Sequence, residues 1–180
     1  HEPAWRRAPL VDDVDVAPGR CAVLGGPAAF AGRVAAAVAA RGGSARLVAE
    51  VRDVLRGEAV LDLRSCAPAA RDDELPGLLA LVRALAAAAE PTRLIVASSR
   101  SQGVSSAEEV APERAMIPAL LSALPHESRA LAARHVDLDP EAPWAADALA
   151  RELAAPAADL ECALRGDGRY VAALAPIDLT

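Results

Sequence analysis

The stretch RCAVLGGPAAFAGRVAAAVAARGG, residues 20–43, decides the fold. Its apolar run at residues 21–24 is too short for an ordinary helix and ends at Gly25-Gly26, a pattern typical of a buried strand followed by a tight turn. Pro27 then opens a helical segment that stops at Gly42-Gly43. The apolar side chains of this segment recur one helical turn apart, at Phe30, Val34 and Val38.

A second strand is predicted at residues 44–49, directly after this helix. Two consecutive strands joined by a helix pair in parallel through a right-handed crossover, which makes the unit the first half of a Rossmann-like fold. We therefore expect an α/β protein with a mainly parallel sheet and helices on both faces.

The rest of the chain continues this alternation of strands and helices. Further strands are expected at residues 59–63, 92–97 and 135–138. Helices are expected from residue 75 to near Glu90-Pro91, at residues 113–124 with an interruption at Pro118, and at residues 143–155. Residues 159–164 and 169–174 flank Gly166-Asp167-Gly168 and predict a C-terminal β-hairpin. The residues expected to line the core are Leu24, Val48, Leu61, Ile95 and Val136.

The length of 180 residues, with 53% hydrophobic residues, indicates one domain, residues 1–180, with a sizeable core. Residues 20–174 form the expected Rossmann-like core. Residues 1–9 carry Trp5 between Pro3 and Pro9, and such a proline-bracketed segment predicts an edge strand.

Charge and composition exclude several functions. All 19 basic residues are arginine, so the chain has no lysine for a Schiff base or for the proton relay of short-chain reductases. A net charge of -6 argues against nucleic-acid binding, which requires clustered positive charge. No apolar stretch is long enough to span a membrane, and no signal segment is visible. Cys21, Cys66 and Cys162 have no metal-site spacing and indicate reduced, buried thiols of a cytoplasmic protein.

The first turn departs from a dinucleotide-binding turn. Such a turn needs spaced glycines that let the backbone approach a pyrophosphate. Here Gly25 and Gly26 are adjacent, Pro27 removes an amide donor, and Gly32 falls inside the helix. Glu50 stands where a ribose-binding acid would belong, but without the glycines it indicates only a solvated carboxylate. We expect no bound cofactor.

The serine-rich loop at residues 98–106 follows a strand of the parallel sheet, where ligands usually gather. A reductase would use Ser98 or Ser99 together with a tyrosine base about a dozen residues on, and the only tyrosine is Tyr170. The loop therefore indicates a polar surface segment.

Histidines and acidic residues give no stronger site. His1, His126 and His135 are dispersed and lack metal-ligand spacing, and sequence alone leaves a Ser-His-Asp triad open. Asp13 and Asp15 resemble a calcium loop, but its later ligands are missing. We expect no metal and no catalytic residue.

The order and spacing of these segments nevertheless resemble those of a known family. The matching segments are Trp5-x-x-x-Pro9, GRCAVL at residues 19–24, VAARGG at residues 38–43, the helix at residues 78–85, LIVASSRSQGV at residues 94–104, Glu127 before RHVDLD at residues 134–139, and ALRGDGRYVAAL at residues 163–174. Over essentially its whole length the chain resembles the structural subdomain of a modular type I polyketide synthase ketoreductase.

The resemblance implies a truncated Rossmann-like half that binds no NADPH and braces a second, catalytic half. The catalytic half would begin beyond Thr180 and would hold NADPH and the catalytic residues that reduce the β-keto group of an intermediate on the acyl carrier protein. Its partners would be that half and the neighbouring synthase domains of a bacterial megasynthase, with the acyl carrier protein involved only indirectly. A similar half also occurs as a pseudo-ketoreductase without an active partner.

The edge strand is the expected contact with the catalytic half, with Trp5, Arg6 and Arg7 as interface residues. Two other functions remain open: a free-standing short-chain oxidoreductase with an altered nucleotide turn, and a non-enzymatic Rossmann-like binding module.

Overall fold

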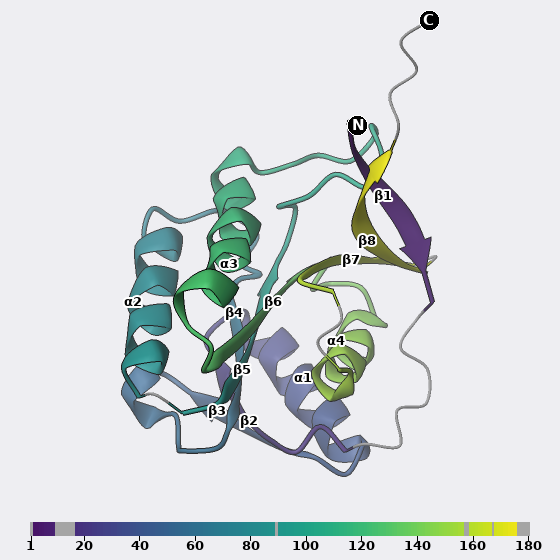
Figure 1. Cartoon of the computed structure of the whole chain (residues 1–180). Coiled ribbons are helices and arrows are strands. Elements are labelled where there is room, and N and C mark those ends of the chain that lie inside the picture. Colours follow the sequence, from purple (N-terminus) through teal and green to yellow (C-terminus); the bar gives the residue numbers. More distant parts are fainter. Residues whose placement is uncertain (1, 10–16, 89, 157–158, 167, 176–180) are drawn as a thin grey trace, which may run out of the picture.

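The computed structural model describes residues 2–9, 17–88, 90–156, 159–166 and 168–175 (Figure 1). Eight strands form one sheet in the order β1-β8-β7-β6-β5-β4-β2-β3. The strands are β1 (Glu2–Ala8), β2 (Arg20–Leu24), β3 (Ser44–Val48), β4 (Ala59–Ser65), β5 (Thr92–Ser98), β6 (Leu131–Asp137), β7 (Glu161–Arg165) and β8 (Gly168–Ala175). The helices are α1 (Ala28–Ala40), α2 (Glu74–Ala87), α3 (Met116–Glu127) and α4 (Ala145–Ala154), with 3-10 helices η1 (Val51–Asp53) and η2 (Pro112–Ala115).

The sheet is parallel from β3 to β7, and β8 and β1 complete it as antiparallel strands. The predicted β-α-β unit and the predicted C-terminal hairpin of β7 and β8 are both confirmed. In a full Rossmann sheet a further strand lies outside β3. Here the connection between β3 and β4 contains only η1, which leaves β3 at the edge and makes the fold a truncated one.

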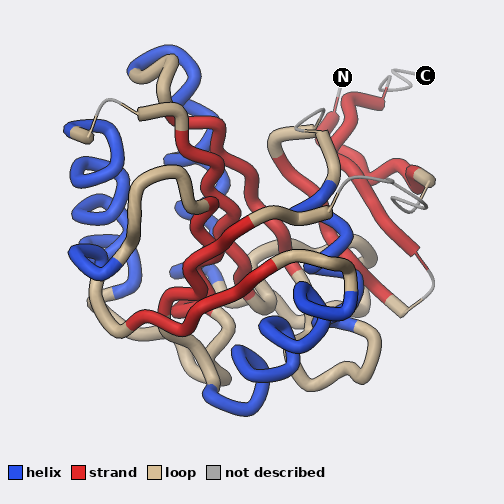
Figure 2. Tube along the Cα trace, turned by 90° about the horizontal axis from the view of Figure 1, so that it is seen from below, coloured by secondary structure: helices blue, strands red, loops and turns tan. Residues whose placement is uncertain are grey.

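Helices cover both faces of the sheet, as expected for parallel strands (Figures 1 and 2). One apolar cluster packs α1 and α4 on one face, and a second packs α2 and α3 on the other. Because side chains of a strand alternate between faces, Val23 belongs to the first cluster and Leu24 to the second. The five residues expected in the core, Leu24, Val48, Leu61, Ile95 and Val136, are all buried, with 0–7% exposure.

Two boundary predictions were wrong. Pro118 does not interrupt its helix, because it is the third residue of α3, where a backbone N–H would have no intrahelical acceptor. The irregularity comes earlier, in η2, and α3 continues to Glu127. Strand β6 begins at Leu131 rather than at His135, because its parallel pairing with β5 already starts with Leu131 opposite Thr92.

Buried ion pairs connect secondary-structure elements within the apolar core. Glu152 of α4 is 2% exposed and accepts hydrogen bonds from Arg134 of β6 at 2.5 Å and from Arg169 of β8 at 2.6 Å. Burial lowers the pKa of Arg169, but the hydrogen bonds and charges of its partners, Glu152 first among them, together outweigh burial, so the pKa is raised. These ion pairs join α4 to β6 and β8, two strands that do not follow one another in the sequence.

A second carboxylate, Glu58, holds the short β3 edge. It accepts hydrogen bonds from the Leu55 amide at 2.9 Å and from Arg46 of β3 at 3.0 Å, and Arg20 of β2 lies 3.7 Å away. Burial raises the pKa of the Glu58 carboxyl, but these hydrogen bonds and charges outweigh it, so that the pKa lies below its usual 4.5.

We predict that Glu58→Gln lowers stability by about 1 kcal/mol at pH 7, because the variant loses charge-assisted hydrogen bonds. A lowered folded-state pKa means that the contribution is complete above pH 4.5 and is lost as pH falls through the folded pKa. In urea titrations the gap between the variant and the parent should therefore narrow as the pH falls below 4.5 and close once the pH lies below the folded-state pKa of Glu58. Glu127→Gln, an exposed control, should show no gap at any pH. A gap that persists at acid pH would contradict this.

We also predict that Ile95→Ala costs about 2–5 kcal/mol, because Ile95 is 1% exposed in the middle of the sheet. Leu47→Ala is the matched control, since Leu47 is an aliphatic strand residue with 56% exposure and should change stability by less than about 1 kcal/mol. Urea unfolding measures both. Equal losses in the two variants would be inconsistent with the position of Ile95 in the core.

Candidate functional site

The turn between β2 and α1 is filled by the protein itself. Gly25 and Gly26 have positive φ angles of 62° and 83°. A Cβ atom on Gly25 would lie 2.5 Å from Cγ of Arg64, and one on Gly26 would lie 2.6 Å from Cβ and O of Leu63. These glycines therefore allow β4 to pack against the turn. Their conformational freedom serves internal packing at this position.

Arg64 lies across this turn and reaches the start of α2. Its Nη1 would be 2.9 Å from a Cβ atom on Gly77, and its guanidinium donates to both carboxylate oxygens of Asp62, at 2.9 and 2.6 Å. The hydrogen bonds to Asp62 raise the pKa of Arg64. Glu50, the expected ribose-side acid, is exposed and lies 4.0 Å from Arg52. The guanidinium beside the first turn is therefore already paired with a carboxylate of this chain, that of Asp62.

The structure brings two serines, a histidine and an aspartate together inside the protein. Ser98, at the end of β5, lies 2.8 Å through Oγ from Nε2 of His135, and Ser101 donates its hydroxyl to Oδ1 of Asp137 at 2.8 Å. All four residues are buried, with 0–1% exposure. Nδ1 of His135 has no hydrogen-bond partner among the described residues and lies 3.7 Å from Oε1 of Glu161.

This cluster does not have the geometry of a nucleophilic triad. Asp137 accepts from Ser101 and from Arg165 at 2.8 Å, so it binds the serine side of the cluster and leaves the far nitrogen of His135 unsupported. Ser98 has 0% exposure, so its hydroxyl is not accessible from solvent. His126 is exposed near the end of α3, and His1 lies outside the described residues, as do Asp13 and Asp15.

Ser99 belongs to a second buried network that the sequence did not reveal. Its hydroxyl and carbonyl oxygens accept hydrogen bonds from Nη1 of Arg114, at 2.8 and 3.0 Å. Arg114 has 0% exposure and also pairs with Glu74 at 2.8 Å. A lone arginine after a proline and a glutamate carries no sequence signal of burial.

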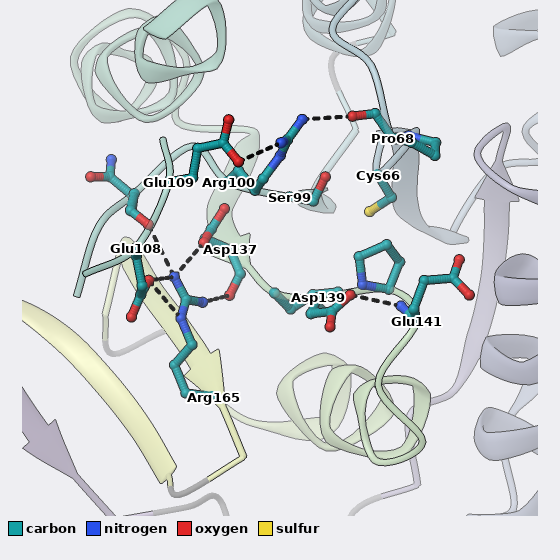
Figure 3. Close-up of a pocket in the computed structure, with 13 residues that line it drawn as sticks. Cys66, Pro68, Ser99, Arg100, Glu108, Glu109, Asp137, Asp139, Glu141 and Arg165 are labelled. Atoms are coloured by element: carbon teal, nitrogen blue, oxygen red, sulfur yellow. Dashed lines mark hydrogen bonds and ion pairs between the residues drawn. The ribbon is translucent and has the colours of Figure 1, made fainter. Parts of the chain in front are cut away.

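One cleft opens at the carboxyl ends of β4, β5 and β6 (Figure 3). We call it the carboxyl-edge cleft, and its volume is about 540 Å³. It lies where ligands bind in open parallel sheets. Its lining residues are Cys66, Pro68, Ser99, Arg100, Gln102, Glu108, Glu109, Asp137, Leu138, Asp139, Pro140, Glu141 and Arg165.

Two arginines on the cleft wall are held by ion pairs and carbonyl groups. Arg165 of β7 donates to Asp137 at 2.8 Å and to Glu108 at 2.7 Å. Burial raises the pKa of the Glu108 carboxyl, but the hydrogen bond and charge of Arg165 together with hydrogen bonds from backbone amides outweigh burial, and the pKa is lowered. Arg100 donates to the carbonyl oxygen of Pro68 at 2.7 Å and to Glu109 at 3.4 Å (Figure 3). Its φ of 58° is left-handed, a conformation that persists only where the surroundings enforce it.

The thiols and the described acids do not form a metal site. The three cysteines are buried and unpaired, as predicted, and burial raises the pKa of Cys21 to about 11. Among the described residues no group of three or more histidine, cysteine, aspartate or glutamate side chains could hold a metal ion. None of the described helices is long and apolar enough to cross a membrane.

The expected interface residues lie on β1, at the outer edge of the sheet. Trp5 is half-buried and faces Ala172 of β8 across the ladder. Arg6 and Arg7 are exposed, and the Arg7 guanidinium approaches Gly168, where a Cβ atom would lie 2.9 Å from Nε. Strand β1 pairs with β8 on one side and has no strand on its other side in the described sheet.

Comparison with known proteins identifies the fold. No protein-family model matches the chain, and no curated protein is similar to it. A C2-type ketoreductase from a modular polyketide synthase matches with a TM-score of 0.75 at 23% identity, over 99% of this chain and 44% of that one. The first ketoreductase of the tylosin polyketide synthase matches with a TM-score of 0.73 at 21% identity, over 95% of this chain and 40% of that one.

A third structure places the same fold in a different assembly line. It contains adenylation, ketoreductase and pseudo-Asub domains of a keto acid-selecting nonribosomal peptide synthetase module, and it matches with a TM-score of 0.76 at 16% identity, over 98% of this chain and 18% of that one. The chain thus spans less than half the length of each of these proteins. From end to end it has the fold of one part of a ketoreductase structure.

Proposed function

We propose that this chain is the noncatalytic structural half of a polyketide synthase ketoreductase. The observation that carries the proposal is the coverage: 99% of this chain matches only 44% of a modular polyketide synthase ketoreductase. A half of that size, with one continuous Rossmann-like sheet, is what the family resemblance in the sequence implies. Its role is to brace an NADPH-dependent catalytic half, which reduces the β-keto group of a polyketide intermediate on the acyl carrier protein.

The structure of the turn between β2 and α1 supports the proposal that this half binds no dinucleotide cofactor. A pyrophosphate needs free backbone amides and room above the turn. Arg64 and Leu63 take up the space beside Gly25 and Gly26, and the Arg64 guanidinium is already paired with Asp62. The chain has no lysine, and Ser98 is fully buried. These observations favour a bracing role over a free-standing oxidoreductase.

The carboxyl-edge cleft is the one observation that favours the second candidate, a non-enzymatic binding module. Its volume of about 540 Å³ lies within the range of small-molecule sites. The bracing and binding functions are compatible in one domain, and separate measurements test them.

We predict that the chain alone does not bind NADPH or NADH. Calorimetric titration should show no saturable heat, with a complete polyketide synthase ketoreductase as the positive control. The Arg64→Ala variant should also show no saturable heat, because the substitution opens space at the turn without supplying spaced glycines. A dissociation constant below about 100 µM, which is worth about 5.5 kcal/mol, would favour the oxidoreductase instead.

We further predict that the catalytic half adds to the open edge of β1, because an edge strand offers unpaired N–H and C=O groups. In hydrogen exchange, edge amides within Trp5, Arg6 and Arg7 should exchange rapidly in the chain alone and slow when the catalytic half is supplied in trans. Trp5→Ala should weaken the association about tenfold or more, since an aromatic anchor supplies much of the buried area at such contacts.

Leu47→Ala is the control at the opposite edge of the sheet and should leave the association unchanged. It alters an exposed residue of β3, which is separated from β1 by the full width of the sheet. Equal protection of the β1 amides with and without the catalytic half would show that the docking surface lies elsewhere.

A further inference from the structure

We propose that His135 is a pH-sensitive link within the sheet, and that a proton taken up at its Nδ1 joins β6 to Glu161 of β7. This inference does not depend on the bracing role. It concerns the junction where the parallel part of the sheet meets the end formed by β7, β8 and β1. The junction of β6 and β7 is the shortest pairing in the described sheet, from His135 opposite Glu161 to Asp137 opposite Ala163.

Three short contacts on one side of the His135 ring determine where its hydrogen lies. Nε2 lies 2.8 Å from Oγ of Ser98, which lies 2.8 Å from Oγ of Ser101, which lies 2.8 Å from Oδ1 of Asp137. Each contact needs one hydrogen, and the two hydroxyl groups supply only two. Asp137 acts as an acceptor, because the Arg165 guanidinium and the Ser101 amide also donate to its carboxylate, each at 2.8 Å. The third hydrogen therefore belongs to Nε2.

The hydrogen on Nε2 leaves Nδ1 of a neutral ring as an acceptor that faces a second acceptor. Oε1 of Glu161 lies 3.7 Å from Nδ1 and already accepts a hydrogen bond from Gln102 at 2.6 Å. Nδ1 has no hydrogen-bond partner among the described residues, and His135 has 0% exposure. A proton on Nδ1 turns this pair into a donor and an acceptor. Because the Glu161 side chain is 25% exposed, it can move by the roughly 1 Å that an ordinary hydrogen bond requires.

The groups around the ring can receive a positive charge. Alternate residues of β6 share a face, so His135 lies on the same side as Ala133, in the apolar cluster that packs α2 and α3. The charged groups that the surrounding elements bring to this end of the face are Asp137 of β6, Glu161 and Arg165 of β7, Glu108 of the loop after β5, Arg114 of η2 and Glu74 of α2. They comprise four carboxylates and two guanidiniums. Among these described groups, only the carboxylate of Glu161 has no arginine partner.

Proton uptake would connect three strands at their shortest junction. A charged His135 would hold Glu161, the first residue of β7, and Glu161 already binds Gln102 of the loop after β5. The link is present on the acid side of the histidine transition and is lost as the pH rises through that transition. This dependence is opposite to that of Glu58, whose contribution is lost in acid. Histidine ordinarily titrates between about pH 5 and 8, so the link would respond within that range.

Ring ¹⁵N NMR of the full chain tests the proposal, because it separates protonated from unprotonated ring nitrogens. The other histidines are assigned with His1→Gln and His126→Gln, which leave His135 intact. At about pH 8.5 Nε2 of His135 should carry a hydrogen and Nδ1 none, and Nδ1 should gain one as the pH falls to about 5.

Glu161→Gln identifies the carboxylate responsible, because glutamine removes the charge and keeps an oxygen that can accept from Gln102. The midpoint of proton uptake at Nδ1 should fall by about one pH unit, a tenfold loss of proton affinity. The exposed control Glu127→Gln should leave the midpoint unchanged.

Urea unfolding of the same two variants supplies an independent readout. At about pH 5.5, where glutamate is still ionised, Glu161→Gln should unfold at a lower urea concentration than the parent. At about pH 8.5 it should equal or exceed the parent, because the glutamine amide can donate to Nδ1. The proposal is overturned if Nε2 lacks a hydrogen at about pH 8.5 or if Nδ1 stays unprotonated down to about pH 5. It is equally overturned if Glu161→Gln leaves the midpoint unchanged, or if its stability differs from that of the parent by the same amount at both pH values.

Discussion

The guanidinium of Arg114 holds the carboxyl edge of the sheet together. It has no solvent exposure, and its donors reach the carbonyl oxygens of Ala67 and Ala69 after β4, the carbonyl and hydroxyl oxygens of Ser99 after β5, and both carboxylate oxygens of Glu74 at the start of α2. A buried charge with this many partners is costly to disrupt, by about 3–5 kcal/mol when one partner of the pair is removed. These loops form walls of the cleft, so its shape depends on a residue that does not line it.

The parts of the fold that could be predicted are those whose signals are local. The apolar run before Gly25 and the helical spacing of Phe30, Val34 and Val38 fall within one segment, and pairing in a parallel sheet follows from their order. The core position of Ile95 follows in the same way, because a central parallel strand is apolar on both faces. Helix bounds such as those of α3 depend instead on which amide lacks an acceptor, which is why Pro118 misled.

The candidate site was beyond prediction because its contacts join distant segments. His135 meets Ser98 across the pairing of β5 and β6, and Arg165 meets Glu108 across more than fifty residues. Sequence spacing carries no trace of these pairs. The buried arginines were missed for a related reason: arginine is usually exposed, and only the folded structure supplies the carboxylates that allow Arg114 and Arg134 to be buried. The departure of the first turn from a dinucleotide-binding turn could be predicted, because the missing glycines are visible within one segment. The position of the Arg64 side chain beside Gly25 could not.

The pairing of β1 with β8 brings the two ends of the described chain to one place. Glu2 lies opposite Ala175 in an antiparallel ladder, where facing Cα atoms are about 5 Å apart. Within a longer polypeptide such a domain behaves as an insertion with both connections at a single point. The segments on either side could then be rejoined with little change in their separation if the domain were removed, and a circular permutant that links these ends would need only a short loop. This arrangement allows a whole folding unit to be exchanged between multidomain proteins without a change in the spacing of its neighbours.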